Sequence, residues 1–215
     1  MLNLTTRFLI FLQFLLPSLA FATPVQTDHA TVELISEYDA IVPGKSFDLA
    51  VRFDLEEGWH TYWENPGDSG LATKVSWRLP VQIKIGEPRY PYPERLDYQG
   101  LTNYGFKNDV FILFPITLSD DIKSNTLHPI SVDVEWLLCK EECIIQNATL
   151  TTSLYVLPNQ TQYSIYATDI QNKVKQLPQP YEDDVTFASS DKVITFEIPY
   201  QNASSDLKSA YFYPL

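Results

Sequence analysis

The only two cysteines among the 215 residues are Cys139 and Cys143, and three residues separate them. Thiols this close can form a structural disulfide, a redox couple or a two-thiol metal site. A disulfide that closes about five residues stabilises a fold by only roughly 2 kcal/mol, against about 4.7 kcal/mol for about 100 residues. A structural role is therefore better served by distant cysteines. Spacing alone leaves both the redox couple and the structural disulfide open and favours a metal site less.

The cysteine pair follows a predicted strand. Residues Ile130–Trp136 alternate apolar and polar side chains, which is typical of a half-buried strand. Helical positions four residues apart hold their Cβ atoms about 5 to 6 Å apart, whereas a disulfide needs about 3.5 to 4.5 Å. If Cys139 and Cys143 form a disulfide, the sequence predicts that they do so in a turn.

A second stretch rich in chemistry is Gly58–Gly70, which places three large aromatic residues and a histidine within five positions. If this stretch is a strand, Trp59 and Trp63 share the core face, and His60 and Tyr62 lie on the opposite face. That opposite face is then either solvent-exposed or part of a site.

A third stretch is the proline-bounded segment Tyr90–Gly100, which contains Asp97 and Tyr98. One interpretation is a surface crossover whose prolines prevent edge pairing. The other is a flap that shields a reactive thiol. The second interpretation predicts that Tyr62 and the Asp97–Tyr98 segment lie within contact distance of the cysteine pair.

The rest of the chain predicts a β-rich scaffold for these groups. Apolar and polar residues alternate clearly over Ser46–Leu55, and short β-like runs recur at roughly even spacing, a pattern typical of a sandwich or a barrel. The other predicted strands are Thr31–Ser36, Trp59–Trp63, Thr73–Leu79, Val81–Ile85, Val110–Leu118, Ile130–Leu138 and Thr149–Leu157.

The pattern changes after Pro158. One helix is predicted over residues 163–177, because Tyr166, Ile170, Val174 and Leu177 recur at helical spacing before a proline. Strands are predicted again at Val193–Ile198 and Ala210–Tyr213, too few to form a stable sheet alone. We therefore expect a sandwich domain over 23–158, a helical linker over 159–180, and the start of a second, incomplete β domain over 181–215.

Residues 1–22 are predicted to be a secretory signal peptide, with Arg7, an apolar core over Phe8–Leu19, and a small-residue cleavage site at Ala20–Ala22. Export would place the cysteines where a disulfide can persist. The formal net charge of −12 argues against nucleic acid as a partner, which requires clustered Lys and Arg. No sequence motif indicates a metal site or a cofactor.

Several of these motifs occur together, in order: Gly58–Trp63, Asn65–Gly70, Tyr92–Arg95, Tyr104–Phe106 and Trp136–Cys143. In this combination, residues 30 to 158 resemble the N-terminal periplasmic domain of DsbD-type thiol:disulfide interchange proteins, and within them the ScsB, or copper-sensitivity-suppressor, branch. The resemblance implies an immunoglobulin-like antiparallel β-sandwich in the bacterial periplasm. The chain departs from the best-known members in having three rather than five residues between the cysteines.

The resemblance also implies a function and site residues. The Cys139–Cys143 dithiol would take electrons from a membrane-embedded domain and pass them to periplasmic thioredoxin-fold proteins, as a protein-disulfide reductase that acts with partner domains. Tyr62 matches an aromatic residue beside the family's cysteines, and Asp97 and Tyr98 fall where its cap loop lies. Two alternatives stay open: Cu(I) capture by the same two thiolates, and a structural sandwich with a minor disulfide.

Overall fold

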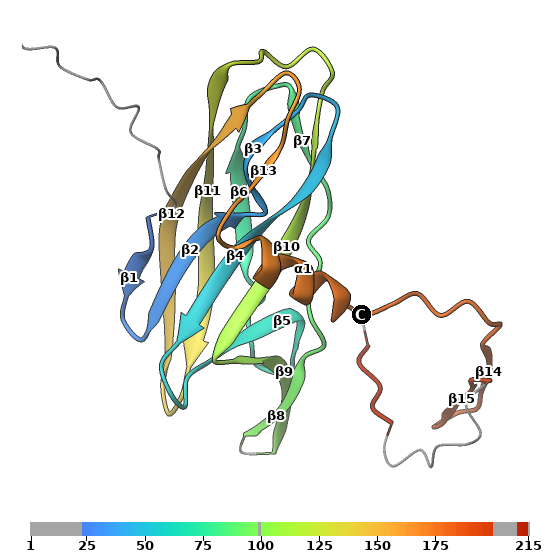
Figure 1. Ribbon diagram of the computed structural model, residues 1–215. Helices are drawn as coiled ribbons and strands as arrows, with labels where there is room; N and C mark the ends of the chain where they lie inside the picture. Colours follow the sequence, from blue (N-terminus) through green and yellow to red (C-terminus); the bar gives the residue numbers. More distant parts are fainter. Residues whose placement is uncertain (1–22, 99, 200–209, 215) are drawn as a thin grey trace, which may run out of the picture.

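The computed structural model describes residues 23–98, 100–199 and 210–214 of the chain. Two β-sheets pack face to face as the two layers of a sandwich (Figure 1). The first sheet has five strands in the order β1-β2-β4-β10-β7. Its strands are β1 (Val25–Thr27), β2 (Ala30–Ser36), β4 (Ser46–Leu55), β10 (Asp109–Leu118) and β7 (Ile83–Ile85). The neighbouring strands of this sheet are antiparallel.

The second sheet has eight strands in the order β13-β3-β12-β11-β5-β9-β8, with β6 also paired to β11. Its strands are β13 (Gln162–Tyr163), β3 (Tyr38–Ile41), β12 (Cys143–Val156), β11 (Thr126–Cys139), β5 (His60–Gly67), β9 (Leu101–Lys107), β8 (Glu94–Tyr98) and β6 (Lys74–Arg78). All of its pairings are antiparallel except that of β12 with β3. The predicted antiparallel sandwich is confirmed.

The core lies between the two sheets and is built from the alternate residues that each strand turns inward. On β4 these include Leu49, Val51 and Phe53, all fully buried, as the alternation over Ser46–Leu55 predicts. Trp136 of β11 lies edge-on to Phe53, with ring centroids 5.4 Å apart. Trp59 also belongs to this core, as predicted from its position.

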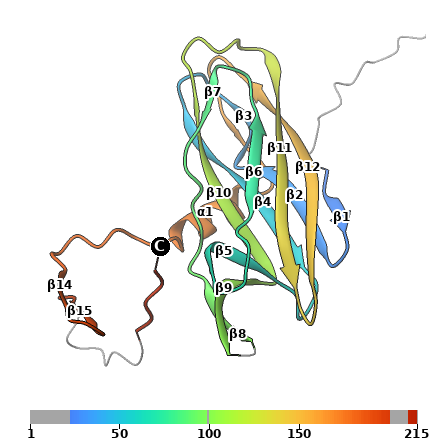
Figure 2. The same cartoon turned by 180° about the vertical axis from the view of Figure 1, so that it is seen from behind.

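The hairpin of β11 and β12 is the longest element of the fold. Each strand has 14 residues, and their register runs without interruption from Thr126 opposite Val156 to Cys139 opposite Cys143. Viewed from behind, β11, β12 and β6 form one layer of the sandwich (Figure 2). The hairpin therefore carries the cysteine pair to one end of the sandwich.

The predicted helix is confirmed in kind but is shorter than expected: α1 spans Ala167–Lys175. Ile170 and Leu177 are buried against Phe111 and Leu113 of β10, on the outer face of the five-stranded sheet. Tyr166 and Val174 pack beside them, as the helical spacing predicts. The helix covers apolar surface that would otherwise face water.

The interpretation of Tyr90–Gly100 as a loop is wrong for its second half. Glu94–Tyr98 forms β8, which pairs with β9 from Glu94 opposite Gly105 to Tyr98 opposite Leu101. Pro91 and Pro93 precede the strand rather than interrupt it, so the backbone N–H groups of β8 remain free to pair. The resulting hairpin projects from the same end of the sandwich as the cysteine turn (Figures 1 and 2).

The C-terminal part of the chain differs from the sandwich. β14 (Thr186–Ser189) and β15 (Ile194–Glu197) form a two-stranded sheet in which every residue is exposed. The strand predicted at Ala210–Tyr213 is wrong, because these residues adopt no strand. Instead, the Tyr213 ring packs against Trp63, and the carbonyl oxygen of Pro214 accepts a hydrogen bond from Asn65 Nδ2 at 2.7 Å. The domain division at 158 and 180 stays a prediction.

The predictions on membrane spans and on the signal peptide have different outcomes. No helix in the described part of the chain is long and apolar enough to cross a bilayer. The predicted signal peptide, residues 1–22, lies outside the described residues.

The buried Trp136 ring should contribute strongly to the stability of the fold. Trp136→Ala should lower the free energy of unfolding by about 3 to 5 kcal/mol, because the ring is 1% exposed and its removal leaves a cavity beside Phe53. Urea unfolding followed by circular dichroism measures the effect. The matched control on the same hairpin is Ile145→Ala, since Ile145 is 61% exposed. Equal unfolding midpoints for the two variants would contradict this description of the core.

Candidate functional site

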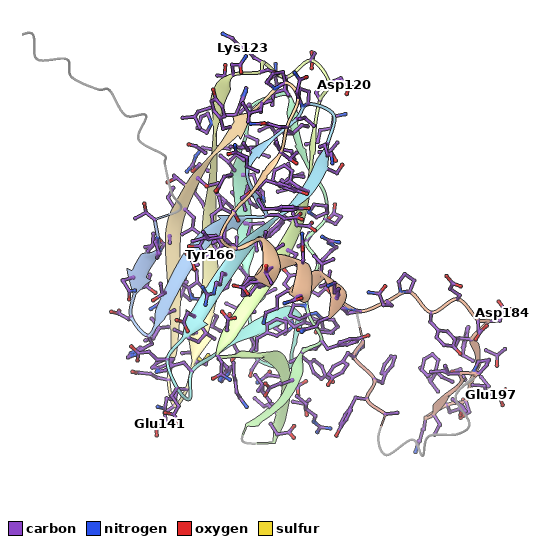
Figure 3. All side chains as sticks on the ribbon, viewed as in Figure 1. Asp120, Lys123, Glu141, Tyr166, Asp184 and Glu197 are labelled. Atoms are coloured by element: carbon purple, nitrogen blue, oxygen red, sulfur yellow. A yellow bond between two sulfur atoms is a disulfide. The ribbon has the colours of Figure 1, made fainter. Side chains whose placement is uncertain are left out.

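Cys139 and Cys143 form a disulfide across the turn that joins β11 to β12. The two residues are register partners with their Cα atoms 4.2 Å apart, and the backbone N–H of Lys140 donates to the carbonyl oxygen of Glu142 at 3.0 Å. The prediction that a disulfide would form in a turn at a strand end is confirmed. Glu141 marks this turn at one end of the molecule, opposite the end that carries Asp120 and Lys123 (Figure 3).

The two cysteines differ sharply in exposure. Cys139 is only 2% exposed, whereas Cys143 is exposed. Cys139 packs with Tyr62 and Leu137 in a small apolar cluster separate from the main core. An incoming thiolate can therefore reach the sulfur of Cys143 more readily than that of Cys139.

The face opposite the core at this end of the sheet holds His60 and Tyr62. His60 is the register partner of Cys139 across β5 and β11, and its Nε2 lies 3.3 Å from the hydroxyl oxygen of Tyr62. Tyr62 is 3% exposed and packs against Cys139. The structure therefore brings His60 and Tyr62, two of the predicted site residues, to the disulfide, while Trp59 and Trp63 take the core face.

Burial controls the protonation of both side chains. Burial of the imidazole, and secondarily the charge of Lys107, lowers the pKa of His60 below its ordinary value of 6.5. Burial raises the pKa of the Tyr62 phenol. Both groups are therefore neutral at neutral pH.

The turn between β4 and β5 supports the disulfide turn from the side. Lys140 Nζ donates to the carbonyl oxygen of Glu57 at 3.3 Å. Gly58 has a φ of 85°, and a Cβ there would lie 2.9 Å from Cε of Lys140. A glycine at this position satisfies the left-handed backbone and leaves room for the lysine stem.

The side chain of Asp97 is not brought to the disulfide. Strands β5 and β9 separate β8 from β11, which corresponds to roughly 14 Å across the sheet at about 4.8 Å per strand. Asp97 is exposed and instead accepts hydrogen bonds from Arg95 Nε at 2.9 Å and Thr102 Oγ1 at 3.1 Å. The side chain of Tyr98 lies outside the described part of the structure. The predicted contact between Asp97 and the cysteine pair is therefore wrong. The segment predicted to be a flap over the cysteines is instead strand β8 at the edge of the sheet, with two strands between it and β11.

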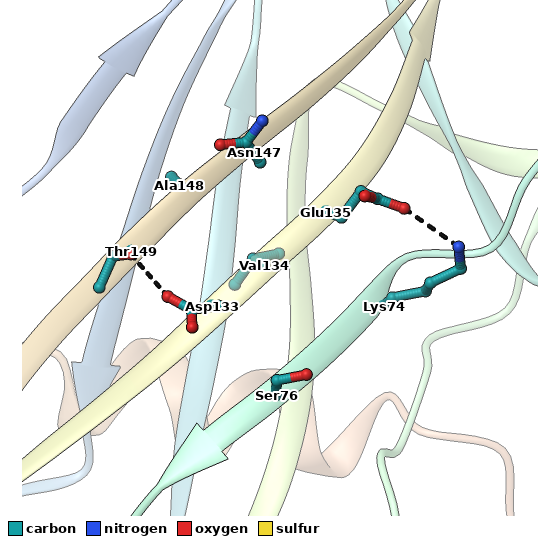
Figure 4. Close-up of a pocket in the computed structure, with 8 residues that line it drawn as sticks. All are labelled: Lys74, Ser76, Asp133, Val134, Glu135, Asn147, Ala148 and Thr149. Carbon is teal, nitrogen blue, oxygen red and sulfur yellow. Dashed lines mark hydrogen bonds and ion pairs between the residues drawn. The ribbon is translucent and has the colours of Figure 1, made fainter.

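A pocket of about 360 Å³ lies further along the outer face, between β6, β11 and β12 (Figure 4). Its charged groups bind one another or neighbouring polar groups: Lys74 Nζ lies 3.0 Å from Glu135 Oε1, and Thr149 Oγ1 donates to Asp133 at 2.6 Å. Because these partners satisfy one another, the pocket is not the candidate site.

Within the described residues, no group of three or more His, Cys, Asp and Glu side chains is placed to hold a metal ion. A Cu(I) site would have to rely on the two cysteine sulfurs after reduction of their disulfide.

Comparison with known proteins identifies the family. Residues 31–154, more than half of the chain, match the family model of the N-terminal domain of the thiol:disulfide interchange protein DsbD. The chain belongs to this family. Membership in the DsbD N-terminal family, together with the disulfide, establishes a thiol:disulfide exchange module.

One solved structure agrees with the fold described here. The N-terminal periplasmic domain of ScsB from Proteus mirabilis is 19% identical and superposes with a TM-score of 0.60, covering 80% of this chain and 66% of that domain. The chain thus spans about two thirds of the length of that domain. The DsbD N-terminal domain of Neisseria meningitidis, in its reduced form, is 16% identical, with a TM-score of 0.35 and coverage of 63% and 90%. A search of curated proteins finds no match.

Sequence reasoning missed two residues that shape the site. Leu137 was assigned only to a strand, yet it packs on Cys139. Gly70 only ends the aromatic stretch in the sequence analysis, but a Cβ there would lie 2.2 Å from Cδ1 of Tyr62, so the tyrosine ring packs directly on its backbone. The alternation of Leu137 with the core residue Trp136 was the sequence signal that could have identified Leu137. No sequence pattern indicated that Gly70 packs against Tyr62.

The disulfide should contribute little to stability. Cys143→Ala removes a link that closes only about five residues, so it should cost roughly 2 kcal/mol or less. Urea unfolding of the variant, compared with the oxidised wild type and with Trp136→Ala, measures this. A loss as large as that of the tryptophan variant would indicate a structural disulfide.

Proposed function

We propose that this chain is a periplasmic electron-relay module. In this proposal the Cys139–Cys143 dithiol receives electrons from a membrane-embedded donor domain and reduces disulfides in thioredoxin-fold partners. The observation that supports it best is the asymmetric disulfide of a DsbD-family domain, in which Cys143 is an exposed residue and Cys139 is buried in contact with Tyr62 and Leu137. The donor and the partners are inferred from the family.

The exposure of the two sulfurs suggests an order of events. In the reduced protein, the Cys143 thiolate attacks the partner disulfide and forms a mixed disulfide, while the partner's other sulfur leaves as a thiolate. Cys139 then attacks the sulfur of Cys143, the intramolecular disulfide forms, and the partner departs reduced. Two electrons pass from the dithiol to the partner. Reduction of the module follows the same steps in reverse.

The β8–β9 hairpin is assigned a shielding role in this proposal. It projects at the same end as the disulfide, so the hairpin, whose strand β8 includes Asp97 and Tyr98, would limit the approach of partners along that side (Figure 1). Asp97 and Tyr98, the predicted cap residues, would then act by limiting the access of partners to the cysteine pair.

A trapping experiment tests the proposal. Cys139→Ser leaves Cys143 able to attack but removes the resolving thiol, so mixing the reduced variant with oxidised thioredoxin should accumulate a mixed disulfide. Cys143→Ser is the matched control and should accumulate far less, because its remaining thiol is buried. Non-reducing electrophoresis and intact-mass spectrometry measure the adduct.

Two outcomes would contradict the relay. One is equal trapping by the two variants, which would mean that exposure does not direct attack. The other is an absence of exchange combined with tight one-to-one Cu(I) binding that is lost in Cys139→Ser, which would support the copper-capture alternative.

A further inference from the structure

His60 has a position that the exchange reaction alone does not explain. It is paired directly opposite Cys139 in the antiparallel register of β5 and β11. Side chains of directly opposite residues lie on the same face, with Cβ atoms about 4.5 to 5.5 Å apart. The imidazole therefore lies beside the less exposed of the two sulfurs.

The imidazole is held in place by its neighbours. Tyr62, two residues along β5, contacts it through the hydroxyl oxygen at 3.3 Å from Nε2 and through its ring, edge-on with centroids 5.3 Å apart. Lys107 of β9 is its other register partner, and Lys107 Nζ lies 3.2 Å from Glu94 Oε2 of β8. The titratable groups that face His60 are thus Cys139 from β11, Tyr62 from β5, and the Lys107–Glu94 pair from β9 and β8.

The attack of Cys139 on the mixed disulfide requires a base beside its thiol. Before Cys139 can attack the mixed disulfide, its thiol must lose a proton, since the thiolate is the nucleophile. Cys139 is 2% exposed, so bulk water is poorly placed to take the proton or to solvate the thiolate. A neutral imidazole beside the sulfur supplies an acceptor.

We propose that His60 accepts the thiol proton of Cys139 as Cys139 attacks Sγ of Cys143 in the mixed disulfide. The Cys139–Cys143 bond forms, the bond from Cys143 to the partner sulfur breaks, and the partner leaves as a thiolate while His60 becomes an imidazolium. The imidazolium then releases its proton to solvent, and in the reverse direction it protonates the departing Cys139 thiolate. The inference rests on the proposed order of attack through Cys143.

A pH dependence follows from the surroundings of His60. Burial and the charge of Lys107 lower the pKa of His60 below 6.5. At pH 6.5 and above, the imidazole is therefore mostly neutral and able to accept a proton. The wild-type resolving step should therefore stay fast near pH 7. Without His60, the rate of the resolving step should keep rising toward higher pH, because an unassisted thiol has an ordinary pKa of about 8.5 and burial disfavours the thiolate further.

Stopped-flow kinetics with the aromatic disulfide dithiobis(nitrobenzoic acid) separate the attack by Cys143 from the resolution by Cys139. The first coloured thiolate is released when Cys143 attacks the reagent, and the second when Cys139 resolves the mixed disulfide. His60→Gln should leave the first release within about twofold and slow the second by about 100-fold at pH 7, the lower end of the range for loss of a general base. The deficit should shrink as the pH rises above the ordinary thiol pKa of about 8.5, because a growing fraction of the thiol then ionises without help.

The controls distinguish a chemical role from a structural one. His29→Gln removes a histidine that stacks on Trp59 near the same end, with ring centroids 4.1 Å apart, and should leave both releases unchanged. Tyr62→Phe keeps the ring but removes the hydroxyl near Nε2, and should slow only the second release, by a smaller factor than His60→Gln. Urea midpoints check that each variant is folded.

A second release that is unchanged in His60→Gln, or slowed equally at every pH, would overturn the role of His60. Absence of the first release in the wild-type protein would instead overturn the proposed attack through Cys143. The two failures are therefore distinguishable in one set of traces.

Discussion

The register of β11 is the constraint on which the rest of the site depends. One uninterrupted antiparallel pairing with β12 sets Cys139 opposite Cys143, and one bridge to β5 sets Cys139 opposite His60. Because side chains alternate between faces, the same register sends Trp136 and Leu138 into the core and Leu137 and Cys139 to the outer face. A shift of one residue would exchange the two sets, so the stability of the core also fixes the geometry of the disulfide.

The site therefore combines a well-packed core with a disulfide that contributes little to the stability of the fold. The core beneath it is anchored by fully buried side chains such as Phe53, whereas the disulfide closes so short a segment that its loss should change stability little. Breaking and reforming the bond can then proceed without unfolding the sandwich. The small cluster of Tyr62 and Leu137 over Cys139 leaves Cys143 as the accessible sulfur, which gives the exchange a direction of approach.

Local patterns in the sequence predicted the elements that pattern alone can specify. Alternation predicted β4 at its observed bounds and the division of Trp59 and Trp63 from His60 and Tyr62, because a strand has a fixed period of two. The β8–β9 hairpin was missed because prolines next to a short strand resemble a loop until the partner strand is known. The pairing of His60 with Cys139 joins residues far apart in the chain, and no local pattern specifies which strands become neighbours. The packing of Gly70 against Tyr62 depends on the same tertiary information.

The reduction potential of the Cys139–Cys143 couple tests the central claim that this disulfide is a reversible redox group. It can be measured by equilibrating the protein with glutathione or thioredoxin buffers of known potential and quantifying the reduced fraction by thiol alkylation and mass spectrometry. A relay module should have a potential above about −300 mV, in the range of about −120 to −270 mV found for thiol:disulfide exchange proteins. A potential far below about −300 mV would be that of a structural disulfide and would contradict the account.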